Sequence, residues 1–219
     1  VYDTILGEVI NNMILMKDII DDHHPLIREI SQPVAMPLSQ EDEQLLLDMH
    51  EFLVNSQDED ISEKYQLRPA VGIAAVQLGV LKRMCAIHVL TYDHDGNIKK
   101  ADDYALVNPK IVSYTEKQSY LKDGEGCLSV NDDVDGYVPR HAKVTVKGYD
   151  VLTHQDVTIV ARGFLSICLQ HELDHFDGKL FYDHINKDNP NDRKSSLRYN
   201  ILSREMLNVL SEGKDDKAK

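Results

Sequence analysis

The sequence predicts an α+β fold, in which antiparallel or mixed β-sheets pack around a central helix that carries a His-Glu-x-x-His motif. Three observations favour this class. Short β-like runs crowd residues 70–151, a helix pattern precedes them at 39–57, and one strand-to-helix segment follows them at 158–178. Helices and strands are therefore grouped along the chain, which is typical of α+β proteins and not of doubly wound sheets.

The chain that leads into the β-like region is predicted to be extended at first and then helical. Residues 23–34 (HHPLIREISQPV) contain prolines that resist helix formation. Ser39 and Asp42 then occupy the N-cap and N3 places of a helix whose apolar residues recur on one face. We predict that this helix covers 39–57 and that the polar residues 55–64 form a surface connection.

Four β-like runs fill the middle of the chain. They occupy residues 71–80, 83–90, 104–114 and 141–150. Residues 93–96 (DHDG) have the composition of a turn between two of these strands. The segment 158–178 begins as the strand-like TIV and continues as a helix that Gly178 would end.

Length and composition fit one domain between two flanking segments. A chain of 219 residues with 42% hydrophobic composition can bury one sizeable core. We expect residues 13–210 to form that domain and residues 211–219 to be a disordered tail. Residues 1–12 start with Val and are expected to be a flexible or artificially added extension. Within the domain, residues 193–210 predict a helix with one apolar face.

Charge and cysteine content narrow the classes of function. The formal net charge is −13, and this acidic balance argues against direct nucleic-acid binding. Three scattered cysteines fit a reducing compartment better than a disulfide framework, so we expect a cytoplasmic protein. No apolar stretch of the sequence approaches the roughly 20 residues of a membrane span, so no membrane association is expected.

Residues 170–175 (QHELDH) indicate a metal site. On a helix, His171 and His175 lie one turn apart on the same face, so both imidazoles can bind one ion. Glu172 is offset by one residue and can take a proton from a water that the ion acidifies. Two ordinary histidines on a structural helix are the alternative until a third ligand is found.

Several residues compete for the place of the third ligand. Glu205 would suit a thermolysin-like enzyme but lies thirty residues downstream, and Phe181 stands where a metzincin has its third His. Cys168 lies seven residues, about 10 Å of helix rise, from His175 and is expected to pack in the core. Cys85 lies in the apolar run RMCAIHV and is also expected to be buried.

Cys127 is placed differently from the other two cysteines. It lies in DGEGCLSV between Gly124 and Gly126, where the backbone can turn sharply and present a side chain to another segment. One Cys with two His would leave the fourth tetrahedral position open for water or substrate, as in catalytic zinc sites. A structural cysteine in a loop is the alternative.

Three motifs together resemble those of the peptide deformylase family. They are GIAAVQLGV at 72–80, EGCLSV at 125–130 and QHELDH at 170–175, and the resemblance covers roughly residues 16–185. The long stretch between motifs resembles the class found in Gram-positive bacteria and mycoplasma-like relatives. The resemblance implies a single catalytic deformylase domain over 13–210, which removes the N-formyl group from N-formylmethionine of nascent polypeptides.

The resemblance also implies roles for individual residues. Cys127, His171 and His175 would be the metal ligands, and Glu172 the general acid and base. The Gln77 side chain and the Leu128 backbone N–H would polarise the formyl oxygen. The residues implied in substrate binding are Val71, Gly72 and Gly126.

A single divalent metal ion is the implied cofactor, with Fe²⁺ as the native ion. The ligand types Cys, His and His also allow Ni²⁺, Co²⁺ or Zn²⁺. The implied substrate is a formylmethionyl nascent peptide, and this suggests that the protein works near the ribosome.

Two further residues differ from the motif residues named above. Ala70 replaces the usual first glycine of the first motif, and Arg140 reads as a solvated loop arginine that could otherwise steer a substrate carbonyl or carboxylate.

Two other functions stay open at the level of sequence. A zinc endopeptidase would share the His-Glu-x-x-His motif but would cleave internal peptide bonds and need a downstream ligand. A catalytically degenerate module would hold the metal without turnover. Formate release from a formylated peptide distinguishes both from a deformylase.

Overall fold

The computed structural model describes residues 13–191, so the predictions for residues 1–12, 193–210 and 211–219 lie outside the described residues. The α-helices are α1 (Gln40–Gln57), α2 (Glu59–Tyr65) and α3 (Gly163–His175). The strands are β1 (Gly72–Ala74), β2 (Met84–Tyr92), β3 (Ile98–Tyr114), β4 (Gln118–Ser119), β5 (Arg140–His141), β6 (Lys143–Asp150) and β7 (Gln155–Arg162). Short 3-10 helices are η1 (Met16–Asp18), η2 (Pro25–Arg28), η3 (Ala75–Leu78) and η4 (Phe181–His184).

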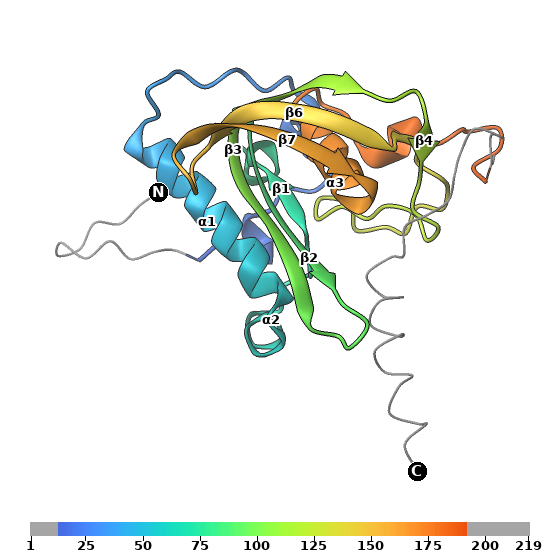
Figure 1. Ribbon diagram of the computed structural model, residues 1–219, viewed down its shortest axis with the longest axis horizontal. Coiled ribbons are helices and arrows are strands. Elements are labelled where there is room, and N and C mark those ends of the chain that lie inside the picture. Colours follow the sequence, from blue (N-terminus) through green and yellow to red (C-terminus); the bar gives the residue numbers. More distant parts are fainter. Residues whose placement is uncertain (1–12, 192–219) are drawn as a thin grey trace, which may run out of the picture.

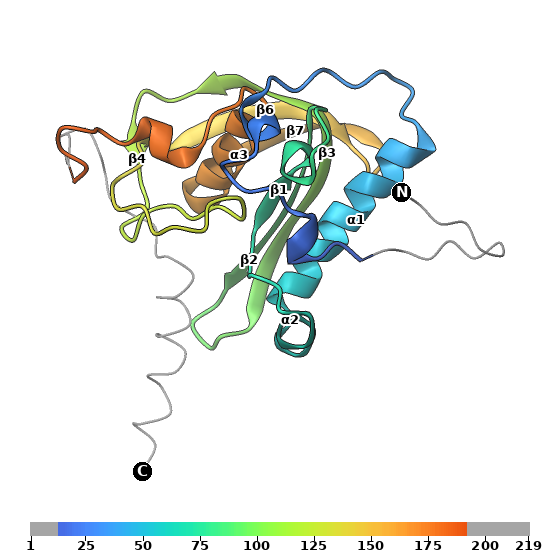
Figure 2. The same cartoon turned by 180° about the vertical axis from the view of Figure 1, so that it is seen from behind.

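Five strands form one bent antiparallel sheet with the order β1-β2-β3-β6-β7, and β4 pairs with β5 in a separate small sheet. Helix α1 crosses one side of the β1-β2-β3 part of the sheet (Figure 1). Helix α3 lies on the other side, under the arch of β6 and β7, as the reverse view also shows (Figure 2). This arrangement of an antiparallel sheet and helices agrees with the predicted α+β class.

Both faces of β2 are buried, and this explains its nearly continuous apolar sequence. Cys85 and Ile87 belong to the core cluster that also contains the α3 residue Leu169. Met84 and Ala86, which point the opposite way, belong to the cluster formed with α1. Strand β2 thus separates two hydrophobic cores: one face packs in the core that contains α3 residues, and the other packs in the core that contains α1 residues.

Helix α1 starts as the sequence predicts. Ser39 is the N-cap, and its hydroxyl oxygen accepts a hydrogen bond from the Asp42 N–H at 3.1 Å. The buried side chains of this helix include Leu46, Met49, Phe52 and Leu53. The turn predicted at 93–96 also joins β2 to β3, and its Gly96 has a φ of +82°.

Three local predictions were wrong. The polar segment 55–64 contains most of α2, because Asp58 caps a new helix by accepting from the Ile61 N–H at 2.9 Å. The proline segment contains η2, since Pro25 is the first residue of this 3-10 helix, where a missing N–H costs nothing. The run 71–80 is a strand only over β1 and then becomes η3.

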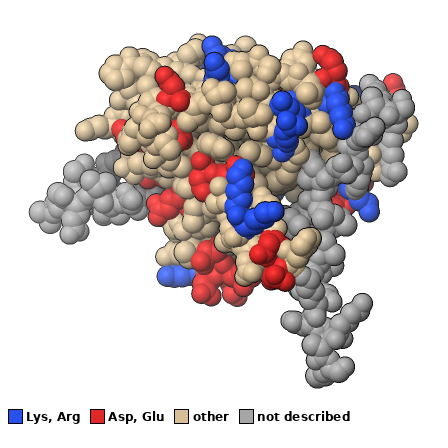
Figure 3. Space-filling model, viewed as in Figure 1, with Lys and Arg blue, Asp and Glu red and all other residues tan. Residues whose placement is uncertain are grey.

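The charged side chains are distributed unevenly over the surface. On the face seen in Figure 3, Lys and Arg are scattered, whereas Asp and Glu gather at the lower end. Helix α2 lies at that end in Figure 1 and has Glu59 and Asp60 in its first turn. No helix within residues 13–191 is long and apolar enough to span a membrane.

Candidate metal centre and active site

Helix α3 and the loop between β4 and β5 bring three metal-ligating side chains together. Cys127 comes from the loop, and His171 and His175 come from the last turns of α3. Their ligand atoms all lie within 4.8 Å of one another, and the Cys127 Sγ is 3.5 Å from the His175 Nε2. The imidazole centroids of the two histidines are 5.1 Å apart. The three predicted ligands therefore meet at one point.

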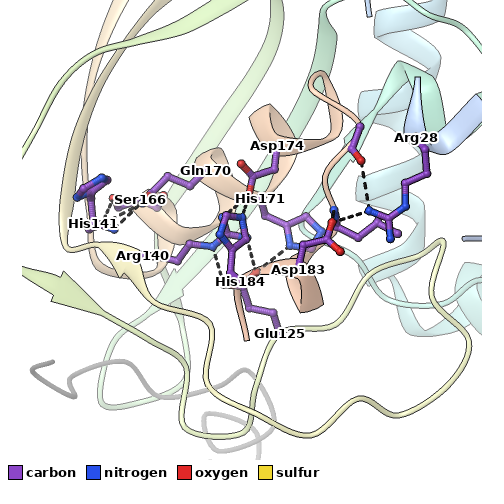
Figure 4. Close-up of polar contacts among 12 residues, drawn as sticks. Arg28, Glu125, Arg140, His141, Ser166, Gln170, His171, Asp174, Asp183 and His184 are labelled. Atoms are coloured by element: carbon purple, nitrogen blue, oxygen red, sulfur yellow. Dashed lines mark hydrogen bonds and ion pairs between the residues drawn. The ribbon is translucent and has the colours of Figure 1, made fainter. Parts of the chain in front are cut away.

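A buried carboxylate holds His171 in a defined orientation. Glu125 Oε2 lies 2.9 Å from the His171 Nδ1, so this nitrogen is the donor and the Nε2 is free to bind an ion. Arg140 donates two hydrogen bonds of 2.9 Å to the same carboxylate, from its Nε and Nη2 (Figure 4). Burial alone would raise the pKa of Glu125, but Arg140 and His171 hold it below its ordinary value.

Arg140 is not the solvated loop arginine that the sequence suggested. Its side chain is 3% exposed, and it joins Glu125 to Asp174, which also accepts from the His184 Nε2 at 2.7 Å (Figure 4). Despite burial, these partners lower the pKa of Asp174 to about 2. Arg140 thus neutralises Glu125 and the α3 residue Asp174, and each of its three guanidinium nitrogens contacts one of these carboxylates.

Glu172 is buried next to the predicted ligands with one oxygen unused. Its side chain lines the cavity of the site, and among residues 13–191 its Oε2 is one of the few buried side-chain atoms without a hydrogen-bond partner. Burial raises the pKa of Glu172 to about 7. Strand β1 packs tightly against it, because a Cβ added at Gly72 would lie 2.4 Å from the Glu172 Oε1. A side chain at position 72 would therefore force the Glu172 carboxylate to move.

The Gln77 amide is fixed by its own backbone. Its Oε1 accepts a 2.9 Å hydrogen bond from the Ala74 N–H, and its Nε2 therefore points to Cys127 Sγ at 3.5 Å and Ser129 Oγ at 3.2 Å. Gln77 is 1% exposed. The orientation of this buried amide makes its NH₂ group the donor that faces the cavity.

A cavity of about 680 Å³ connects these side chains to the surface, a volume typical of ligand sites. Its walls include the predicted residues Val71, Gly72, Gln77, Gly126, Cys127, Leu128, His171 and Glu172. Strand β1 is the outermost strand of the described sheet order, so the edge that does not pair with β2 is available to an extended ligand.

The donor set fits a single divalent transition-metal ion. A thiol and two imidazoles are the ligand types of catalytic zinc and iron sites that keep one position open. Within residues 13–191, the His175 Nδ1 is also buried without a hydrogen-bond partner, like the Glu172 Oε2. Buried polar groups left without partners are costly, and a ligand or water in the cavity that Glu172 lines can supply the missing partner of its Oε2.

Comparison with known protein families decides the identity of the chain. The family model described as polypeptide deformylase matches residues 16–191. This chain belongs to the peptide deformylase family. Peptide deformylases remove the N-formyl group from formylmethionyl nascent peptides and use a single catalytic metal, and this chain is such a hydrolase.

Curated deformylases of Gram-positive bacteria are close in sequence. A peptide deformylase of Oceanobacillus iheyensis is 51% identical over 178 residues, which cover 81% of this chain and 94% of that protein. Peptide deformylase 2 of Bacillus cereus is 47% identical with the same coverage. These relatives agree with the Gram-positive class that the motif spacing indicated.

Solved deformylases share the fold. The structure of peptide deformylase from Ehrlichia chaffeensis superposes with a TM-score of 0.62 at 26% identity, covering 92% of this chain and 98% of that chain. An actinonin-bound class I type b peptide deformylase from Acinetobacter baumannii gives a TM-score of 0.58 at 27% identity, covering 80% of this chain and all of the other.

The replaced glycine of the first deformylase motif does not strain the backbone. Ala70 is not among the described residues with positive φ, and its side chain packs against the core on the α1 side. Its N–H donates to the Ser56 Oγ and its carbonyl accepts from the Gln57 Nε2 at 2.8 Å. Gly72, and not position 70, is where a side chain would meet the Glu172 carboxylate.

Sequence reasoning missed Arg68, which holds the loop that carries Cys127 and Leu128 through hydrogen bonds. Its guanidinium donates to the backbone carbonyls of Cys127, Leu128 and Val130 at 3.1 to 3.3 Å. It also donates to the Asn131 side chain at 3.1 Å. The chain places this arginine in YQLRPA, directly before the first motif, and that position is the one available clue.

The rejected ligand candidates lie in the core. Cys168 and Cys85 are buried, as predicted, and burial raises the pKa of both thiols well above the ordinary value. Phe181, at the place of a metzincin ligand, stacks on His171 with ring centroids 6.2 Å apart. Glu205 lies outside the described residues.

Proposed function

We propose that formyl hydrolysis takes place at Cys127, His171 and His175, with Glu172 as the general acid and base. The observation that carries this proposal is the Glu172 carboxylate, which is buried in the cavity wall next to the ligands and has one oxygen without a partner. When bound, a divalent ion acidifies a water and polarises a carbonyl. A carboxylate in this position can accept a proton from the attacking water.

The Gln77 amide and the Leu128 N–H stabilise the developing oxyanion. The Ala74 N–H fixes the Gln77 amide before substrate arrives, so its donor is preorganised. Arg68 donates from its Nη2 to the Cys127 carbonyl at 3.1 Å, and this restrains the peptide plane that also contains the Leu128 N–H. Donors that need no rearrangement stabilise charge more effectively than mobile ones.

The proton and bond balance is complete with these groups. Water oxygen bonds to the formyl carbon, and Glu172 takes one proton from this water. The carbon–nitrogen bond then breaks, and Glu172 returns the proton to the departing amine. The second water proton stays on the formic acid, which ionises to formate, and the other product is a peptide with a free amino terminus.

Val71, Gly72 and Gly126 are proposed to bind the peptide backbone of the substrate. The free edge of β1 supports this role, because an extended peptide can add to an exposed strand through main-chain hydrogen bonds. The Val71 carbonyl itself accepts from the His88 N–H of β2 at 2.9 Å, so the start of β1 is fixed on the side that pairs with β2. Actinonin, which is bound by the Acinetobacter baumannii deformylase, is proposed to occupy this same cavity.

Fe²⁺ is proposed as the native ion, with Ni²⁺, Co²⁺ or Zn²⁺ as possible substitutes that the same ligands accept. We further propose that residues 13–210 act as one catalytic domain in the cytoplasm, near the ribosome, where formylated chains emerge. The acidic net charge of −13 argues against direct contact with nucleic acid.

Formate release from an N-formyl-Met dipeptide tests the proposal. The full chain is prepared without oxygen and loaded with Fe²⁺ or Ni²⁺. Release of the acid and cleavage of the Met peptide bond are then measured with the formyl dipeptide and with its N-acetyl analogue. We expect formate from the first substrate, inhibition by actinonin and no cleavage of the Met peptide bond. Cleavage of that bond would indicate an endopeptidase, and a metal-loaded chain without turnover would indicate a degenerate module.

A further inference from the structure

A second group of metal-ligating side chains lies on the other face of the same sheet. His50 from α1, His88 from β2 and Asp103 from β3 place their ligand atoms within 4.8 Å of one another. We refer to these three residues as the outer cluster. None of them lines the cavity of the active site.

The sheet register builds the outer cluster. His88 and Asp103 are directly paired across β2 and β3, so their side chains leave the sheet on the same face. This face is the one that packs against α1, because His88 has the same strand parity as Met84 and Ala86. His50 then reaches the pair from α1. Three elements that are distant in sequence therefore converge on one point.

The two imidazoles already share one carboxylate oxygen. Asp103 Oδ1 lies 2.8 Å from the His50 Nε2 and 2.6 Å from the His88 Nδ1. The rings meet edge to face, with centroids 5.8 Å apart. Without an ion, each imidazole donates an N–H hydrogen bond to the shared Asp103 Oδ1. With an ion, each neutral ring can carry its proton on its other nitrogen and offer the inner one as a ligand.

We propose that the outer cluster is a second binding site for a divalent transition-metal ion such as Zn²⁺. Two imidazoles and one carboxylate are a common set of three zinc ligands, and the fourth position is left for water. Ligand atoms around tetrahedral zinc are about 3.3 Å apart, so the two imidazole nitrogens need to move away from the Asp103 Oδ1 by roughly 0.5 and 0.7 Å.

The exposure of the outer cluster suits this adjustment. The side chains of His50, His88 and Asp103 are 18%, 11% and 34% exposed, so an ion and its water can enter from solvent. The negative charge of the chain raises the local concentration of cations. A bound ion would join α1 to β2 and β3. Gln57 of α1 donates to the carbonyls of both Ala70 and His88, so α1 is also tied to β2 and to the segment before β1.

Metal stoichiometry tests the proposal on the full chain. Protein freed of metal by a chelator is dialysed against Zn²⁺, and bound zinc is measured by elemental analysis. We expect two equivalents for the natural sequence and one for the double variant His50→Gln/His88→Gln. His94→Gln, which removes an imidazole in the β2–β3 turn, is the matched control and should still bind two.

A variant with an emptied active site separates the two ions. Cys127→Ser/His175→Ala should bind one zinc and gain thermal stability on its addition, and the further change His50→Gln should abolish both effects. The single variant His50→Gln should release formate at the natural rate per catalytic metal, which shows that the fold survives. One equivalent in the natural chain would overturn the proposal. Two equivalents that persist in the double variant would overturn it as well.

Discussion

Cys127, His171 and His175 form one group of metal-ligating side chains, here called the active-site cluster. It has nearly the same composition as the outer cluster but different surroundings. Each combines two imidazoles with one anionic ligand, and each lies against β2, on opposite faces. The active-site cluster opens into a cavity of about 680 Å³ and has buried polar atoms without partners. The outer cluster satisfies its own hydrogen bonds. The ligand types alone predict that a cluster binds a metal ion, whereas an adjoining cavity and polar atoms without partners predict that it also takes part in catalysis.

The support of the ligands differs in the same way. His171 donates to Glu125, and Arg140 fixes that carboxylate through two hydrogen bonds. In the outer cluster, Asp103 is itself the shared hydrogen-bond partner and is one-third exposed. We therefore expect tight and oriented binding in the active site and weaker, adjustable binding in the outer cluster.

Removal of an active-site ligand is the change with the largest expected effect. His171→Asn should lose the catalytic metal, and formate release should fall to the level of the chelated protein, because two remaining ligands cannot retain the ion. The counterpart on the other face, His88→Gln, should keep its rate. Elemental analysis and formate release measure both. If the two variants lost activity equally, the functional distinction between the clusters would be wrong.

The next largest effect is expected from Gln77, the proposed oxyanion donor. Gln77→Ala should keep the metal but lower kcat by ~10²–10³, the usual loss for one such donor. Steady-state kinetics and metal analysis measure this. Ser129→Ala is the control, because its hydroxyl lies 3.2 Å from the Gln77 Nε2 without serving the substrate, and it should change kcat only slightly. Full activity of Gln77→Ala would refute the assigned role.

Neutralising the Glu125 carboxylate, which accepts a hydrogen bond from the His171 Nδ1, should have a smaller effect. Glu125→Gln keeps the shape of the side chain but weakens its bond to the His171 Nδ1, and metal affinity should fall by about 10–100-fold. Competition with a chelator gives the affinity, and the fully loaded variant should turn over almost normally. Glu29→Gln, a change at an exposed carboxylate, serves as the control. Unchanged affinity in Glu125→Gln would mean that His171 is oriented by packing alone.

The smallest expected effect concerns the clamp on the motif loop. Arg68→Ala removes hydrogen bonds to three backbone carbonyls and should lower kcat about tenfold by loosening the loop, with metal content retained. Arg68→Lys should recover part of the rate. Lys64→Ala removes an exposed cation of α2 that lies over the Tyr65 ring, and it should leave kcat unchanged. An equal loss in both alanine variants would indicate a general charge effect.

The sequence predicts the features that depend on short spacing. The shared face of the proposed ligands His171 and His175 follows from helix periodicity, and the start of α1 follows from Ser39, because both signals lie within a few residues. The α+β class follows from the grouping of strands and helices. Cys127 and Gln77 needed the resemblance to a family, since neither local sequence alone excludes an ordinary structural role.

Features that depend on contacts between distant segments could not be predicted. Arg140 is buried because Glu125 and Asp174 approach it from two other segments, and its local sequence YVPRH suggests only a loop. Arg68 is recognisable only once the motif loop is folded against it. His88 was hidden in the apolar run RMCAIHV, since its partners Asp103 and His50 come from another strand and a helix. Strand register and packing decide such pairs.

The most direct test of the central claim is formate release by Glu172→Gln with its metal content measured in the same sample. A glutamine keeps the size of the side chain but cannot accept the proton, and general acid–base catalysis contributes up to about 10⁴-fold. We predict a folded variant with one full equivalent of active-site metal and a rate lowered by about 10⁴, more than in Gln77→Ala. Normal turnover by this metal-loaded variant would contradict the account, because another group would then have to carry the proton.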